Sequence, residues 1–243
     1  MHTDTIRLST GACRLVAHRG LSGVEKENTC AAFLGAGLRR FWGVETDIHP
    51  TADGRFVCCH DRDLRRVAGI EFDVREHTLA EVRAVPLPDR DGTTFRTDLR
   101  VPAFEDYLAI CRRFERVPVV ELKGPFDMRT IRRAVACVRR AGLLDRAVFI
   151  SFHWSDCERV RRLCPDNEVQ YLAGPDPAIP IERHAALRIG ADYRHDRITP
   201  ELVEAFHEAG LRVNAWIVDR LADAARLLDM GVDLITTDIL EEA

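Results

Sequence analysis

The chain has 243 residues, of which 46% are hydrophobic and 30% are charged, a composition typical of an ordinary globular protein. Its length fits one large domain as well as two small ones. The net charge of -4 does not favour the basic surface that nucleic-acid binding needs, so we expect no nucleic-acid partner. An anionic small-molecule ligand is compatible with this charge, because a few local Lys and Arg side chains outweigh it at close range.

No apolar run of the sequence approaches the roughly 20 residues that are needed to span a bilayer. Residues 1–20 carry no charged-then-apolar signal pattern. We therefore expect a cytoplasmic protein without stable membrane insertion, and the sequence leaves its oligomeric state open. The eight cysteines mostly lie inside apolar periodic runs and form no C-x-x-C pair, which favours reduced, buried thiols over disulfides.

The first sixty residues are predicted to alternate between short strands and one helix. Residues 14–17 form a brief apolar strand, and Asn28 and Thr29 provide the polar cap of an amphipathic helix over residues 30–40. A second strand covers residues 43–47. The apolar run at 56–59 is interpreted as the antiparallel or continuing partner of that strand.

Residues 62–100 lack a regular hydrophobic period. Charges are dense there, turn signals recur at Pro86, Pro88 and Gly92, and a short helix is plausible over residues 79–84. A structureless loop of this length is unusual inside a compact domain. We therefore interpret residues 62–100 as a small inserted subdomain that packs on the main body of the chain.

Regular alternation resumes after residue 100. Helices are predicted over residues 103–114, 127–141, 155–163, 180–187, 199–209 and 221–230. Strands are predicted over residues 118–121, 147–150, 169–172, 191–193, 212–218 and 233–236. The helix after the last strand is expected to be short or missing.

Counting along the whole chain gives eight strands of parallel type, near residues 15, 45, 119, 149, 170, 192, 214 and 234. Eight β/α repeats at this length predict an α/β fold, a (β/α)8 TIM barrel that covers residues 1–243 as one domain. A doubly wound open sheet is the alternative. It is disfavoured because no Gly-rich phosphate motif follows the first strand.

Glu45 and Asp47 stand two residues apart in the second predicted strand. Residues i and i+2 of a strand point to the same side, so both carboxylates face one way at the end of this strand. Hard divalent cations take oxygen ligands, and the nearby His60 suits proton transfer near neutral pH. Ordinary surface acids at an exposed strand end would give the same local pattern. The rest of the chain therefore has to decide between a cation site and a solvated strand end.

In a barrel, the carboxyl ends of the strands form one mouth, and catalysis takes place there. The polar and aromatic side chains at the predicted strand ends are His18, Arg19, Glu45, Asp47, His60, Glu121, Lys123 and Trp216. The three carboxylates of Glu45, Asp47 and Glu121 are enough to anchor one Mg²⁺ or Ca²⁺, with water and substrate oxygens completing the shell. The sequence therefore predicts a single divalent-cation site.

The remaining side chains at the mouth suit a small-molecule phosphodiester substrate. Arg19 and Lys123 bring positive charge for a phosphate, and His18 and His60 supply an acid and a base. Trp216 gives an apolar wall for a small organic group. The Lys could instead form a structural pair with the acid two residues before it, and the Trp could be simple core. The conjunction of all these groups at strand ends favours the functional interpretation.

Several motifs of this sequence carry a family resemblance. They are HRG at 18–20, ENT at 27–29, AF at 32–33, GVETDIHPTADG at 43–54, HD at 60–61, ELK at 121–123, SF at 151–152, TPELVEAFHEAGLRVNAWIV at 199–218 and GVDLITTD at 231–238. On these motifs the chain resembles the glycerophosphodiester phosphodiesterases over nearly its whole length. The resemblance implies a (β/α)8 barrel with an inserted segment after the second-strand region.

The same resemblance implies roles for individual residues. Metal ligation would come from Glu45, Asp47 and Glu121, acid–base catalysis from His18 and His60, and phosphate contacts from Arg19 and Lys123. Two positions depart from the family pattern. Lys26 stands where the family usually has Pro, which affects the shape of the mouth and so the headgroup preference. Ile217 stands where Thr is frequent, and alternation is expected to turn it away from the side of Trp216.

The expected activity is metal-dependent hydrolysis of a glycerophosphodiester, such as glycerophosphocholine or glycerophosphoethanolamine, to glycerol 3-phosphate and an alcohol. The sequence leaves open which histidine is the acid, and whether water attacks directly or a substrate hydroxyl first forms a cyclic phosphate. One alternative is a lysophospholipase D-type hydrolase of lysophospholipids. Another is a catalytically silent phosphoester-binding module, against which the intact motif residues argue. A metal-dependent amidohydrolase is disfavoured because its H-x-H first-strand signature is absent.

Overall fold

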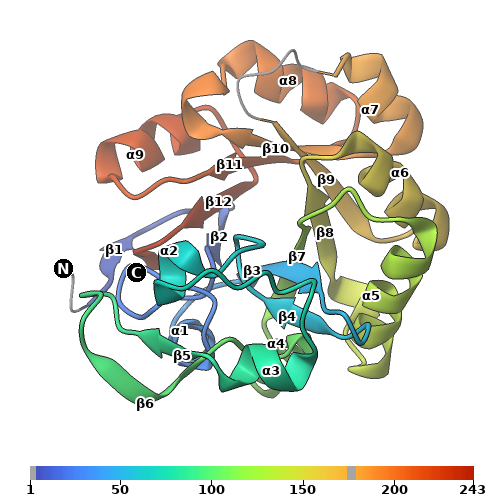
Figure 1. Ribbon diagram of the computed structural model, residues 1–243. Helices are drawn as coiled ribbons and strands as arrows, with labels where there is room; N and C mark the ends of the chain where they lie inside the picture. Colours follow the sequence, from blue (N-terminus) through green and yellow to red (C-terminus); the bar gives the residue numbers. More distant parts are fainter. Residues whose placement is uncertain (1–3, 174–178) are drawn as a thin grey trace.

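The computed structural model describes residues 4–173 and 179–243, and in them eight parallel strands close into a barrel (Figure 1). The barrel strands are β2 (Arg14–Ala17), β3 (Gly43–Pro50), β7 (Val117–Leu122), β8 (Val148–Ser151), β9 (Glu168–Ala173), β10 (Gly190–Arg194), β11 (Val213–Trp216) and β12 (Leu234–Thr237). The barrel closes because β2 pairs with both β12 and β3, with Leu15 opposite Ile235 and Ala17 opposite Val44. The predicted (β/α)8 barrel is confirmed.

Helices surround this barrel on its outside (Figure 1). They are α1 (Cys30–Gly37), α4 (Phe104–Arg113), α5 (Met128–Arg140), α6 (Trp154–Leu163), α7 (Ile181–Leu187), α8 (Pro200–Glu208) and α9 (Leu221–Asp229), with 3₁₀ turns η1 (Leu144–Arg146) and η2 (His195–Arg197). Side-chain caps fix three of the starts: Thr29 accepts a hydrogen bond from the Ala32 N–H, Asp127 from the Thr130 N–H and Thr199 from the Leu202 N–H. Helix α1 ends three residues before the predicted position, because the chain turns there to enter β3.

A short two-stranded sheet that the sequence analysis did not predict joins the two ends of the described chain. Strand β1 (Ile6–Leu8) runs parallel to β13 (Leu240–Glu242), and Ile6 lies opposite Leu240. The expected short or missing final helix is thus replaced by a strand in the described residues. Figure 1 shows the N and C labels close together at this sheet.

The segment between β3 and α4 forms a layer of its own on the side of the barrel that carries β3 and α1 (Figure 1). It contains β4 (Phe56–Cys58), α2 (Arg65–Ala68), α3 (Leu79–Ala84), β5 (Pro86–Pro88) and β6 (Phe95–Arg100). Strand β4 runs antiparallel to the end of β3, and β5 runs antiparallel to β6. A separate apolar cluster holds the segment together, and its members include Val57, Leu64, Val74, Val82, Leu87, Leu99 and Val101.

The barrel strands carry both apolar and polar buried side chains. Buried apolar side chains there include Val16, Val119, Val148, Ile150, Leu172 and Leu234. Strands β9 to β12 carry buried polar side chains, namely Gln170, Asp192, Asn214, Thr236 and Thr237. All eight cysteines are unpaired, and seven of them are buried. Within the described residues, no helix combines the length and the apolar character that crossing a membrane requires.

Candidate active site

Three buried carboxylates meet at the carboxyl ends of β3 and β7. Glu45 and Asp47 lie on β3, and Glu121 of β7 is the direct register partner of Asp47. Their residues are only 2%, 1% and 8% exposed. One oxygen atom from each lies within 4.8 Å of the other two. The structure therefore brings together the three residues that the sequence analysis assigned to a cation.

Donors of the chain itself hold one side of each carboxylate. The Arg19 backbone N–H donates to Glu45 Oε2 at 2.7 Å, and Asn28 Nδ2 donates to Asp47 Oδ2 at 2.8 Å. Lys123 Nζ lies 2.8 Å from Glu121 Oε1. Glu45 Oε1 and Asp47 Oδ1 are buried without a hydrogen-bond partner. Because buried oxygens are rarely left unsatisfied, and hard divalent cations prefer carboxylate oxygen, the donor set fits Mg²⁺ or Ca²⁺.

The pKa values of the three carboxyl groups also favour a cation in this cluster. Burial raises the pKa of Glu45 and of Glu121, and the neighbouring Asp47 charge raises both further. Burial also disfavours the charged form of Asp47, but Arg19 and Lys123 outweigh it and hold the pKa of Asp47 well below its ordinary value. With all three carboxylates ionised, the cluster would carry more negative charge than these two side chains balance. A divalent ion would relieve that repulsion.

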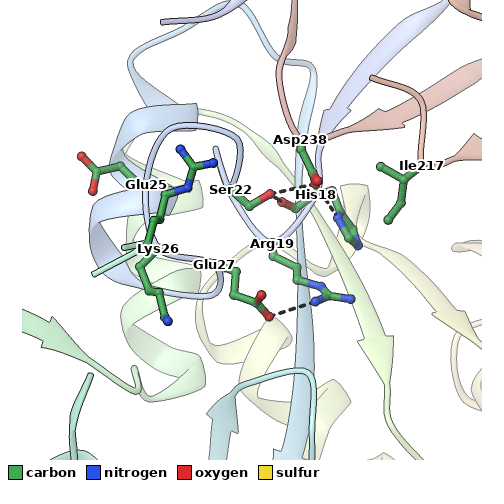
Figure 2. Close-up of a pocket in the computed structure, with 9 residues that line it drawn as sticks. His18, Arg19, Ser22, Glu25, Lys26, Glu27, Ile217 and Asp238 are labelled. Carbon is green, nitrogen blue, oxygen red and sulfur yellow. Dashed lines mark hydrogen bonds and ion pairs between the residues drawn. The ribbon is translucent and has the colours of Figure 1, made fainter. Parts of the chain in front are cut away.

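Each predicted catalytic histidine is bonded to an aspartate through Nδ1. His18 Nδ1 lies 2.7 Å from Asp238 Oδ1, and His60 Nδ1 lies 2.7 Å from Asp61 Oδ1. The Ser22 hydroxyl donates to Asp238 at 2.8 Å, as Figure 2 shows beside His18. A carboxylate on Nδ1 fixes the ring and favours the tautomer whose free Nε2 can exchange a proton with substrate.

A cavity of about 200 Å³ lies against the carboxylates and both histidines. Its lining residues are His18, Arg19, Glu45, His60, Glu121, Ile150, Phe152, Leu172, Asp192, Trp216, Ile217 and Thr236. Trp216 packs edge-on against Phe152, with ring centroids 5.6 Å apart at 86°. The lining of this cavity therefore combines titratable side chains with an apolar wall.

All eight residues chosen from the sequence lie at this site. Asp47 and Lys123 do not line the 200 Å³ cavity themselves; Asp47 lies in the carboxylate cluster, and Lys123 lines a neighbouring cavity with His60 and Glu121. The expectation for Ile217 is wrong, because Ile217 lines the same cavity as Trp216. Strand β11 ends at Trp216, so strand alternation no longer applies to the residue that follows it.

Sequence reasoning missed several residues that complete the site. Asp61, Asp238 and Asn28 belong to motifs that were noticed, but no role was assigned to them. Asp192 carried only a weak signal, as a lone acid in a short strand. It is 1% exposed, its Oδ1 has no hydrogen-bond partner, and burial raises its pKa to about 8 although the Asn214 side chain bonds to it.

Comparisons with known proteins identify the family of this chain. The glycerophosphoryl diester phosphodiesterase family model matches residues 18–242. A glycerophosphodiester phosphodiesterase of Caldanaerobacter subterraneus subsp. tengcongensis is 28% identical, and the alignment covers 92% of this chain and 93% of the relative. A crystal structure of a glycerophosphodiester phosphodiesterase from Parabacteroides distasonis has 28% identity and a TM-score of 0.80, over 93% of both chains.

A further solved structure shares the fold. It is an Oleispira antarctica phosphodiesterase in complex with the product sn-glycerol-3-phosphate, with 24% identity, a TM-score of 0.82, and coverage of 93% of this chain and 92% of that one. Nearly the whole chain takes part in these matches, and the matched residues include every predicted site residue. The chain therefore belongs to the glycerophosphoryl diester phosphodiesterase family.

Proposed function

We propose that this enzyme hydrolyses glycerophosphodiesters at the cluster of Glu45, Asp47 and Glu121, with His18 and His60 as its acid–base pair. The observation that carries the proposal is the buried carboxylate cluster, in which two oxygens have no hydrogen-bond partner, beside a cavity that both aspartate-bonded histidines line. The product of this reaction, sn-glycerol-3-phosphate, is the ligand named for the Oleispira antarctica phosphodiesterase. That likeness supports the same chemistry here.

Glu45, Asp47 and Glu121 are proposed to hold one Mg²⁺ or Ca²⁺, both of which prefer oxygen ligands. A bound divalent cation would polarise the phosphoryl oxygens and offset the charge that develops on them. The chain's own cations are proposed to bind the same phosphate. The Arg19 Nε lies 3.3 Å from Asp47 Oδ2 and the Lys123 Nζ lies 3.5 Å from Asp47 Oδ1, so both stand beside the cluster.

The histidines are proposed to move the two protons of the reaction. One takes the proton from the attacking oxygen as its bond to phosphorus forms. The other gives a proton to the headgroup oxygen as its bond to phosphorus breaks. Both transfers take place at Nε2, because Nδ1 of each ring is bonded to Asp238 or Asp61.

The 200 Å³ cavity is proposed to hold the glycerol unit, which is the constant part of every substrate. Phe152 and Trp216 contact its carbon atoms, and Trp216 is fixed because its Nε1 donates to the Asp192 carbonyl at 2.9 Å. The unpartnered Oδ1 of Asp192 is available for a glycerol hydroxyl. Buried polar groups that are satisfied only by the right ligand are a general source of specificity.

The test uses purified protein with glycerophosphocholine, glycerophosphoethanolamine and lysophosphatidylcholine, each with Mg²⁺, Ca²⁺ or excess chelator. We expect release of glycerol 3-phosphate from the two glycerophosphodiesters, with either cation restoring what the chelator removes. Faster release of choline from lysophosphatidylcholine would instead identify a lysophospholipase D-type enzyme. Tight phosphoester binding without any release would identify a silent binding module.

A further inference from the structure

A second cavity of about 310 Å³ adjoins the catalytic centre on another side of His18 and Arg19 (Figure 2). Its walls come from three parts of the fold: the loop between β2 and α1, the connection between β5 and β6, and the residues that follow β11 and β12. The lining residues are His18, Arg19, Ser22, Glu25, Lys26, Glu27, Arg90, Ile217 and Asp238. Figure 2 shows the wall running from Glu25 and Lys26 on one side to Ile217 and Asp238 on the other.

Every carboxylate in these walls already has a basic partner. Glu25 Oε2 lies 2.7 Å from Arg96 Nη1, and Asp238 is bonded to His18. Glu27 is shared between two guanidinium groups, with Oε1 lying 2.9 Å from Arg19 Nη1 and Oε2 lying 2.7 Å from Nη1 of Arg66. The acids of the cavity are therefore neutralised by the protein itself.

Two cations of the cavity lack such a partner. Lys26 and Arg90 are half-buried, and among the described residues neither side chain forms an ion pair or a hydrogen bond. Arg90 Nη1 is buried without any hydrogen-bond partner. Glu27, Asp89 and Asp91 act on Lys26 through space but do not bond to it. Partly desolvated cations without a directly bonded acid are unfavourable, and an anionic ligand would supply the missing contact.

We infer that this cavity is a headgroup subsite for glycerophosphodiesters whose headgroup carries an anionic group, and that Lys26 and Arg90 bind the oxygens of that group. The inference rests on the proposed function and names a substrate class for the same site. The 200 Å³ cavity is the smaller of the two and has the apolar wall, which suits the constant glycerol unit. The 310 Å³ cavity is larger and polar, and both cavities are lined by His18 and Arg19, beside which we propose that the phosphate binds.

The shared chemistry of the ligand is a charged oxygen group, which a carboxylate or a second phosphate can provide. Glycerophosphoserine and glycerophosphoethanolamine differ by one carboxylate, so their ratio of kcat/KM isolates that group. Glycerophosphoinositol phosphate and glycerophosphoinositol form the corresponding pair for a second phosphate. We expect the wild-type enzyme to prefer, in at least one pair, the substrate whose headgroup carries the additional anionic group. A preference in the first pair indicates a carboxylate, and a preference in the second pair indicates a phosphate.

The variants Lys26→Gln and Arg90→Gln test the assignment to residues. Each is expected to lower the preference for the anionic substrate by about three- to tenfold, because a charged hydrogen bond at a half-exposed site is partly screened. The loss should appear mainly in KM, since the headgroup contact is made in the ground state as well as in the transition state. Lys26→Arg keeps the charge and should retain most of the preference.

Arg65→Gln is the matched control. Arg65 belongs to the same inserted segment as Arg90, and its side chain is 65% exposed, but it does not line the cavity. Its loss should therefore leave the kcat/KM ratio of each substrate pair unchanged. Equal kcat/KM within both substrate pairs, or ratios that Lys26→Gln and Arg90→Gln do not change, would overturn the inference while the phosphodiesterase activity stands. An enzyme that hydrolyses none of the four substrates with either cation would instead contradict the proposed function.

Discussion

His18 and Asp238 are bonded across the seam at which the barrel closes, with 2.7 Å between Nδ1 and Oδ1. His18 directly follows β2, the first barrel strand, and Asp238 directly follows β12, the last one. Thr237 lies opposite Ala17 in the register of these two strands, so closure of the barrel brings the pair together. The orientation of the His18 ring, which we propose to be catalytic, therefore depends on the completion of the fold.

Asp238→Asn should lower kcat by about 10- to 100-fold, the range typical of groups that orient a catalytic residue. An amide keeps the shape but cannot stabilise a protonated imidazole in the same way. The pH dependence of kcat should shift as well, which a merely structural role would not cause. Ser22→Ala removes only the hydroxyl that donates to Asp238, and it serves as the milder control. Normal kcat and an unchanged pH profile for Asp238→Asn would contradict the positioning role.

His18→Ala and His60→Ala should each lower kcat on glycerophosphocholine by about 10²–10⁴-fold, the usual contribution of a general acid or base. Cation binding, followed by calorimetry, should change little in either variant. A nitrophenyl phosphodiester has a leaving group that needs no protonation. With this substrate, kcat should return towards the wild-type value in the variant that lacks the general acid, and should stay low in the variant that lacks the general base. Near-normal kcat in both variants would show that the two rings are structural.

Cation affinity should rise with pH. Burial and the neighbouring charge raise the pKa of Glu45 and Glu121 above the ordinary 4.5, so protons compete with the cation well above that value. Calorimetric titration with Mg²⁺ or Ca²⁺ in two buffers of different protonation enthalpy should reveal proton release on binding. Asp47→Asn should abolish binding in both buffers while the protein stays folded. An affinity that is independent of pH would contradict the competition.

Asp192→Asn should change how stability depends on pH. The carboxyl has a pKa of about 8 in the folded protein and an ordinary value of 3.8, so the folded state binds the extra proton between these values. The contribution of Asp192 to the free energy of unfolding therefore falls as pH rises through this window. Urea unfolding at pH 6 and pH 9 should show the variant gaining stability relative to wild type at the higher pH. The other titrating groups are common to both proteins, so equal pH dependence would contradict the assignment.

The inserted segment over residues 62–100 should control substrate choice more than it controls the barrel. It supplies Arg90 to the 310 Å³ cavity and carries most of an apolar cluster that is separate from the barrel core. Replacement by a short linker should leave the barrel's circular dichroism largely intact and change the relative rates on different headgroups. Because Val57 and Val101 also belong to that cluster, a modest loss of thermal stability is expected. A globally unfolded product would show that the segment is part of the barrel core.

Much of the fold could be predicted from the sequence, because strands and helices leave local patterns of apolar and polar residues. Apolar runs of strand length, capped helices such as the one that starts after Thr29, and their strict alternation indicated the barrel. The i, i+2 spacing of Glu45 and Asp47 placed both carboxylates on one face, and barrel geometry brought Glu121 to them. Local spacing and strand order were therefore enough to predict that the residues chosen for the site lie at one end of the barrel.

Only the tertiary structure could decide the contacts between segments that lie far apart in the sequence, because no local sequence pattern links them. The Asp238–His18 bond joins residues from opposite ends of the chain, and the β1–β13 pairing does the same. Lys26 and Arg90 face one cavity only because the inserted segment packs beside the first loop. Which carboxylates of that cavity are neutralised depends on which of them lie beside an arginine in the folded chain. Sequence periodicity carries information over a few residues, whereas such pairings depend on loop packing and barrel closure, and these determine where each charge comes to lie.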